Sequence, residues 1–396
     1  MLSRRQILLA AAGLPVVAQQ LQVDPTKVPE IPAAPPAPPE ELPSPMTGAR
    51  WKIGFFHDEA DTRMLLTDLV APAPGFALAS GMLAGPRRGR PQNFGLISRN
   101  GGAKWEFVKL PGPPSSLFAL DPDHVWLVSG TRLYVTNDQG TKWRRLSLPK
   151  KMVRVTFLTP QTGFAFGAGK TFHRTSDGGQ RWTPVPEGKD LKLTDENTFF
   201  RVMSFVDGRV GVLAGNSRRP EDEVREFPDW MIPEQALRRR PKPASLAVLT
   251  SQDGGATWDS SVASAFGDVE RLHLRGSRGA MLMSYGEGFV WPSEVFRTDL
   301  TTGKSEPVFR RKSLRVADAL LLGDSGFLLA VIEPFGQLPG AGLPGRLCLV
   351  YSPDGRRWFQ MPVDYRAQGP HALLAAESET RIHAALTNGM ILTLER

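Results

Sequence analysis

Short apolar segments that each follow a turn recur along the chain and set its predicted architecture. There are seven of them, at residues 75–81, 124–130, 163–169, 211–215, 279–285, 326–331 and 381–386. An apolar run of this length bounded by turn residues is typical of a buried strand. No helical periodicity accompanies these runs, and 39 Gly and 35 Pro indicate a chain that turns often. The pattern predicts an all-β protein with seven equivalent strands and no long helix.

A second pattern, Ser/Thr-x-Asp/Asn-x-Gly-x-x-Trp, lies between several of these strands. It occurs at residues 98–105, 136–143, 175–182 and 251–258, and a copy shorter by one residue occurs at 352–358. The hydroxyl and carboxylate can bond nearby backbone amides in a tight turn, Gly supplies a positive φ, and Trp begins the next strand as a core residue. The motif resembles the Asp box. We assign this structural role to Asn100, Gly102, Trp105, Asp138, Gly140, Trp143, Asp177, Gly179, Trp182, Asp253, Gly255, Trp258, Asp354 and Trp358.

The spacing of the motif indicates a β-propeller. Trp105, Trp143 and Trp182 follow one another at 38 and 39 residues, the length of a four-stranded blade. If each apolar segment is the second strand of a blade, the Asp box joins the third strand to the fourth, and the fifth blade has lost its box. The last blade ends one strand short, whereas residues 50–55 resemble the Trp-led fourth strands. We therefore predict a seven-bladed β-propeller with four-stranded antiparallel blades, closed by pairing this N-terminal strand with the last blade.

The N-terminus carries the pattern of an export signal. Arg4 and Arg5 precede a modest apolar run that ends at Val17. We predict a twin-arginine-like signal peptide at residues 1–18, with the general secretory route as the alternative. The run is shorter than the roughly 20 residues that span a bilayer as a helix, so we expect no transmembrane segment in the mature chain. No cysteine follows the run, so we expect no bacterial lipoprotein anchor. The predicted location is periplasmic or secreted, in a bacterium.

The remaining sequence divides into a linker and the propeller. Residues 19–48 are rich in proline, which predicts an extended linker. Residues 49–396 form the predicted propeller, with an insertion at 216–244 in the fourth blade.

Composition narrows the classes of ligand. A net charge of +8 is small for 396 residues, and no nucleic-acid-binding motif is present, so we expect no nucleic-acid partner. Cys348 is the single cysteine, which leaves no intramolecular disulfide and no cysteine-based metal site. The six histidines show no metal-ligand spacing. We expect a monomer with neither a metal site nor a cofactor.

Insertions mark one side of the predicted ring as the candidate binding face. They follow the second strand of blades one, four, five and six, whereas the Asp-box turns follow the third strand and must lie on the opposite side. Arginine beside aromatic residues is enriched at protein interfaces. The candidate binding residues are Arg87, Arg88 and Arg90 in the first insertion and Trp230, Arg238, Arg239 and Arg240 in the fourth-blade insertion. The alternative for that insertion is a solvated loop whose acidic residues neutralise its arginines.

Asp-box propellers include the sialidases, and this resemblance implies a tyrosine nucleophile activated by a glutamate. In this chain the candidate couple is Tyr285 with Glu287. The Arg-Ile-Pro element of sialidases is missing, because the nearest string, Glu30-Ile31-Pro32, lacks the arginine. No convincing catalytic set is therefore present, and a sialidase-like glycosidase or a carbohydrate-binding propeller is the alternative function.

Residues 50–396 also resemble the photosystem II assembly and stability factors, which are exported seven-bladed Asp-box propellers. The resemblance rests on the four full-length boxes, the blade length and the export signal; the fourth-blade insertion and the degenerate late boxes depart from it. It implies a non-enzymatic scaffold. The expected partner is an extracytoplasmic protein, such as a membrane protein under assembly.

Overall fold

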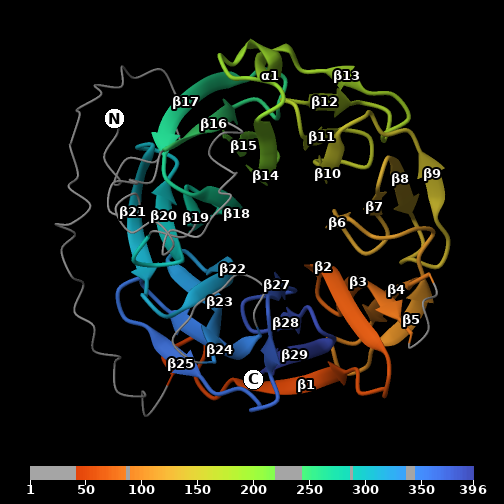
Figure 1. Cartoon of the computed structure of the whole chain (residues 1–396), viewed down its shortest axis with the longest axis vertical. Helices are drawn as coiled ribbons and strands as arrows, with labels where there is room; N and C mark the ends of the chain where they lie inside the picture. Colours follow the sequence, from red (N-terminus) through yellow and green to blue (C-terminus); the bar gives the residue numbers. More distant parts are fainter. Residues whose placement is uncertain (1–41, 86–89, 219–242, 286–288, 336–343) are drawn as a thin grey trace, which may run out of the picture.

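The computed structural model describes residues 42–85, 90–218, 243–285, 289–335 and 344–396. In these ranges 29 strands form seven antiparallel sheets arranged around a central axis (Figure 1). In blades 1 to 6 the strands follow chain order from the axis outward. The predicted seven-bladed propeller with four-stranded blades is confirmed, and each apolar segment singled out in the sequence is the second strand of its blade.

The first three blades extend from Arg63 to Pro184. Blade 1 comprises β2 (Arg63–Ala73), β3 (Phe76–Ala84), β4 (Gln92–Ser98) and β5 (Glu106–Lys109). Blade 2 comprises β6 (Ser116–Ala119), β7 (Val125–Ser129), β8 (Arg132–Thr136) and β9 (Arg144–Leu146). Blade 3 comprises β10 (Met152–Phe157), β11 (Gly163–Gly167), β12 (Phe172–Thr175) and β13 (Thr183–Pro184), followed by the single short helix α1 (Pro186–Asp190) of the described ranges.

The other four blades complete the ring. Blade 4 comprises β14 (Thr198–Val206), β15 (Val210–Ser217), β16 (Ala244–Ser251) and β17 (Asp259–Ala265). Blade 5 comprises β18 (Asp268–Arg275), β19 (Arg278–Ser284), β20 (Ser293–Asp299) and β21 (Lys304–Arg310). Blade 6 comprises β22 (Arg315–Leu322), β23 (Gly326–Pro334), β24 (Gly345–Ser352) and β25 (Phe359–Met361), with β26 (Gln368–Gly369) paired to β24. Blade 7 comprises β27 (Ala372–Ala376), β28 (Ile382–Leu386), β29 (Met390–Glu395) and β1 (Arg50–Phe56).

The two ends of the propeller meet in blade 7, as the missing fourth strand predicted. Strand β1 pairs antiparallel with β29, and Trp51 lies opposite Leu394 in the register. The ring is therefore closed by hydrogen bonds between segments more than 300 residues apart. This pairing leaves β1 as the outermost strand of the blade (Figure 1).

The segment just before β1 also packs on the ring, although the sequence analysis placed it in the linker. Met46 is fully buried in the same hydrophobic cluster as Trp51. The hydroxyl of Tyr351 donates to the carbonyl of Ser44 at 3.1 Å. A lone apolar residue among prolines gives no periodic signal, so the sequence pattern could not reveal this contact.

Each Asp box is a turn held by its own polar side chains. In the box of blade 2, the amide of Gly140 donates to Thr136 Oγ1 at 2.9 Å, and the amide of Lys142 donates to Asp138 Oδ1 at 2.8 Å. Gly140 has a φ of 84°, a region that a residue with a Cβ adopts only with strain. The turn thereby places Trp143 at the start of the fourth strand.

The core consists of seven hydrophobic clusters, one between each pair of neighbouring blades. Six of them contain a Trp at the start of a fourth strand: Trp51, Trp105, Trp143, Trp182, Trp258 and Trp358. The cluster between blades 4 and 5 lacks one, because blade 5 has no Asp box. The Trp residues of the repeats therefore act mainly by packing neighbouring blades against each other.

Candidate functional site

The insertions emerge on one face of the ring, which we name the loop face; the Asp-box turns lie on the other, the box face. The long connections join β3 to β4, β15 to β16, β19 to β20 and β23 to β24, which are second-to-third strand connections. Arg90 is exposed on the loop face just before β4. Tyr285 also lies within the described residues, whereas the remaining binding and catalytic candidates lie outside them: Arg87, Arg88, Trp230, Arg238, Arg239, Arg240 and Glu287.

The base of the fourth-blade insertion is tied to blade 5 by an ion-pair cluster. Arg218, which follows β15, contacts the carboxylate of Asp268 through Nε at 3.1 Å and Nη2 at 2.9 Å. Arg201 lies 3.8 Å from Asp268 and 3.9 Å from Glu270. Ser284 donates to Glu270 at 2.8 Å. These contacts join the loop-face ends of blades 4 and 5.

Next to this cluster lies a group of aromatic and arginine side chains in blade 5, which we name the blade-five aromatic cluster: Tyr285, Phe289, Trp291 and Arg310. The rings of Tyr285 and Phe289 are 5.0 Å apart, and the guanidinium of Arg310 lies over Trp291 at 4.3 Å. Val290, which lies between Phe289 and Trp291 in the sequence, is exposed. Trp291 is buried, and Tyr285 and Phe289 are partly buried, so the cluster packs the loop-face end of blade 5 and leaves Val290 exposed at its edge.

Tyr285 has a buried carboxylate partner that sequence reasoning missed. Its hydroxyl donates to Glu294 Oε2 at 2.8 Å, and Arg310 donates to Glu294 Oε1 at 3.1 Å. Glu294 is nine residues from Tyr285 in sequence, but the antiparallel register of β19 and β20 brings it alongside. A tyrosine hydrogen-bonded to a carboxylate is chemically able to act as a nucleophile.

Charged residues also gather on the inner strands, near the axis. Asp318 is buried and accepts four hydrogen bonds: from the amides of Ala319 and Leu374 at 2.8 and 2.9 Å, and two from Arg271 at 3.0 Å. Asp68 in blade 1 plays the same part, since it accepts from the amides of Leu69 and Leu117 at 2.9 Å. Each carboxylate thereby links its blade to the next.

The sequence signal for this axial cluster was a single aspartate in an otherwise apolar strand. Both aspartates follow a register shift in their strand, at Leu66/Asp68 and at Val316/Asp318. A β-bulge redirects a side chain relative to the regular alternation. Alternation alone therefore cannot predict which way these carboxylates point.

Two histidines beside the axis are held neutral. Burial lowers the pKa of His273 to about 4, and Asp318 only partly opposes this effect. His273 Nδ1 accepts the amide of Leu321 at 2.9 Å, a role that the neutral ring can fill and the protonated ring cannot. Burial also lowers the pKa of His371 to about 4, aided by the neighbouring Arg315.

The described ranges show neither a candidate metal cluster nor a membrane-spanning helix. They hold no group of three or more His, Cys, Asp or Glu side chains arranged to bind a metal ion. None of their helices is long and apolar enough to cross a membrane.

Comparison with known proteins gives one relative by sequence. No family model matches the chain. The photosystem II assembly lipoprotein Ycf48 of Synechococcus sp. (strain CC9902) is 27% identical over 171 residues, which cover 39% of this chain and 50% of that protein. The match thus spans about half the length of the relative.

Solved structures extend the similarity over the propeller. YCF48 bound to D1 peptide has a TM-score of 0.54 at 15% identity, covering 87% of this chain and all of that one. YCF48 from Cyanidioschyzon merolae has a TM-score of 0.54 at 16% identity, covering 87% of this chain and 98% of that one. At these identities the structures show the shared fold. The chain is a seven-bladed β-propeller that is similar in sequence to about half of the assembly lipoprotein Ycf48 and shares its fold with the YCF48 structures.

Proposed function

We propose that this chain is an exported, non-enzymatic scaffold that binds an extracytoplasmic protein on its loop face, in the manner of an assembly factor. The observation that carries the proposal is the blade-five aromatic cluster, which lies on the face from which the arginine-bearing insertions emerge. Aromatic residues and arginine dominate the binding energy of protein interfaces. In this proposal the partner binds on the loop face, where Val290 is exposed beside Phe289.

The relatives support a peptide of a membrane protein as the bound element. One is named as an assembly lipoprotein and another was solved with D1 peptide. We extend peptide binding to this chain, with a membrane protein under assembly as the partner.

Residues 1–18 would direct the monomeric scaffold to the periplasm or outside the cell, and Arg4 and Arg5 would specify the route. Replacing both with Lys should block export if the twin-arginine route is used; unchanged export would favour the general secretory route.

Site-specific photocrosslinking tests the binding face. A crosslinking amino acid at Val290, exposed on the loop face, should capture a defined membrane protein in cells. The matched control places it at Thr141, exposed in the box turn of blade 2 on the opposite face. Replacing Arg238, Arg239 and Arg240 with Ser should weaken the Val290 crosslink without changing the melting temperature. Equal crosslinking from both faces, or capture that is indifferent to the three arginines, would contradict the proposal.

The Tyr285–Glu294 hydrogen bond favours one second candidate, a glycosidase that uses Tyr285 as its nucleophile. A panel of fluorogenic glycosides tests it, with Tyr285→Phe as the variant. Turnover that disappears in this variant would establish the enzyme and overturn the scaffold. Absence of turnover by the wild-type protein, together with its partner crosslink at Val290, would support the scaffold.

A further inference from the structure

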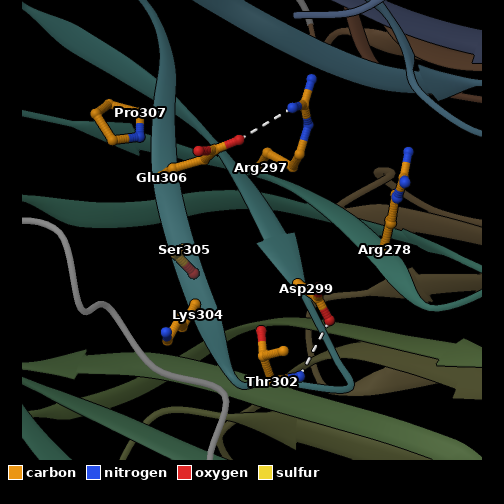
Figure 2. Close-up of a pocket in the computed structure, with 8 residues that line it drawn as sticks. All are labelled: Arg278, Arg297, Asp299, Thr302, Lys304, Ser305, Glu306 and Pro307. Carbon is orange, nitrogen blue, oxygen red and sulfur yellow. Dashed lines mark hydrogen bonds and ion pairs between the residues drawn. The ribbon is translucent and has the colours of Figure 1, made fainter.

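A pocket opens on the box face of blade 5, where the Asp box has been lost. Its volume is about 710 Å³, within the range of small-molecule sites. Figure 2 shows its lining along β20 and β21, with one residue from the neighbouring strand β19. The lining residues are Arg278, Arg297, Asp299, Thr302, Lys304, Ser305, Glu306 and Pro307.

The strand register gathers the charged residues of the pocket on one face of blade 5. Arg278, Asp299 and Lys304 lie side by side across β19, β20 and β21. Two residues further along the strands, Arg297 lies opposite Glu306. Side chains two residues apart along a strand share a face, so both rows point to the same side of the blade. The cluster therefore follows from the backbone pairing.

This charged face looks toward blade 6. Arg278 Nη1 donates to the carbonyl of Asp324 at 2.7 Å, and Arg297 donates to the carbonyl of Asp354 and lies over the ring of Phe327 at 5.5 Å. Asp354 belongs to the Asp box that is one residue short. The pocket thus lies beside the junction of a blade without a box and a blade with a shortened one.

At the junctions of blade 3 with blade 2 and of blade 4 with blade 3, the box glycine lies against apolar side chains of the neighbouring blade. The box glycine of blade 4, Gly255, packs against the ring of Phe164 in blade 3, and Gly179 of blade 3 packs against Leu133 and Leu146 in blade 2. At the corresponding place Gly355 packs against the guanidinium of Arg297. Here a guanidinium joins an apolar ring, since Gly355 also lies against Phe327, and a partly buried charge calls for compensation.

The lining of the pocket carries a surplus of positive charge. Three cations line the pocket against two carboxylates, a net charge of +1. Asp299 Oδ1 is already bonded to the amides of Thr301 and Thr302 at 2.8 and 3.1 Å. Arg297 pairs with Glu306 at 3.0 Å, but its Nε is buried without an acceptor among the described residues. Arg278 and Lys304 are exposed, and neither forms an ion pair with a described residue.

We propose that this pocket binds a small anionic ligand through Arg278, Arg297 and Lys304. The ligand carries a phosphate, sulfate or carboxylate group, because oxygen anions accept the charge-assisted hydrogen bonds that guanidinium and ammonium groups donate. The site lies on the box face and is therefore independent of the partner-binding loop face. A ligand here would give the scaffold a second, separate recognition function.

Isothermal titration with inorganic phosphate, sulfate and citrate tests the site on the full chain. We expect one saturable site for at least one of the three anions. A preference for phosphate and sulfate would assign a tetrahedral oxyanion, and a preference for citrate a carboxylate. Arg278→Gln and Lys304→Gln should each weaken binding about tenfold.

Two further variants separate a specific site from general attraction to a basic protein. Asp299→Asn should strengthen binding about two- to fivefold, since it removes a like charge beside the anion. Lys142→Gln, an exposed lysine in a box turn of blade 2, is the matched control and should leave affinity unchanged. Absence of saturable binding, or an equal loss in Lys142→Gln and Lys304→Gln, would overturn the proposal. Partner crosslinking at Val290 should be normal in all of these variants, so the two proposals fail independently.

Discussion

Replacing Trp51 with Ala tests the closure of the ring. The side chain is 8% exposed and packs in the cluster between blades 6 and 7, on the strand that joins the N-terminal segment to the last blade. Burying an aromatic side chain of this size contributes about 4–6 kcal/mol gross at about 25 cal/mol per Å². Because the site can partly collapse, we expect Trp51→Ala to lower the free energy of unfolding by about 3–5 kcal/mol.

Trp51→Phe should cost much less, for a specific reason. The indole Nε1 of Trp51 is buried and has no acceptor among the described residues, a defect that costs about 1–3 kcal/mol. Phenylalanine removes this donor while it keeps most of the apolar contact. Trp258 is the matched control, because it is similarly buried and its Nε1 donates to the carbonyl of Gly255 at 3.2 Å. Trp258→Phe should therefore be the more destabilising of the two phenylalanine substitutions.

Urea unfolding followed by far-UV circular dichroism measures these losses. Hydrogen exchange then locates them: Trp51→Ala should speed exchange in both β1 and β29, which pair across the closure. Val262, exposed on β17, supplies the reference for an ordinary surface truncation. If Trp51→Ala costs no more than Val262→Ala, or if only β1 exchanges faster, the closure contributes little stability and the reasoning is refuted.

Three further predictions concern buried charge and titration. Asp318→Ala should lower the free energy of unfolding in urea by about 3–5 kcal/mol, because it leaves the Arg271 guanidinium without its carboxylate partner. Glu379→Gln, at the exposed pair with Arg275, should lower it by under about 1 kcal/mol. Equal losses would contradict the axial role of Asp318. His273 has a folded pKa of about 4 against an ordinary value of 6.5, so the wild-type protein should lose stability as the pH falls from 6.5 to 4. His273→Asn keeps an acceptor for the amide of Leu321 and should lose less stability over that pH range. Identical pH profiles for the two proteins would contradict this role of His273. Hydrogen bonds from the Arg181 amide and side chain lower the pKa of Asp177 from 3.8 to about 2. Asp177→Asn should therefore be less stable than the wild-type protein at neutral pH, and this difference should shrink as the pH falls from 3.8 through 2. A difference that stays constant with pH would argue against an ionic role of Asp177.

The sequence predicted the ring because the interactions that define it are local. An Asp box needs only a hydroxyl, a carboxylate and a glycine within a few residues, and Trp51 resembled the Trp that follows each box. Asp318 and Arg271 are 47 residues apart and meet only after two blades have packed. Glu294 reaches Tyr285 through strand register. Charged contacts of this kind depend on bulges and pairing that a repeat pattern does not encode.

The irregular blades concentrate the candidate chemistry for a physical reason. In a repeat fold each unit is stabilised by its neighbours, so a motif that seals an interface leaves little freedom to vary. Blade 5 lacks the box and its Trp, and its cluster with blade 4 is the one among the seven described without a box-like Trp. The Arg218–Asp268 pair and the blade-five aromatic cluster lie on the loop-face side of this blade, and the charged pocket lies on its box-face side. Loss of the sealing motif thus coincides with polar groups on both faces of one blade, which is where binding on either face should be sought.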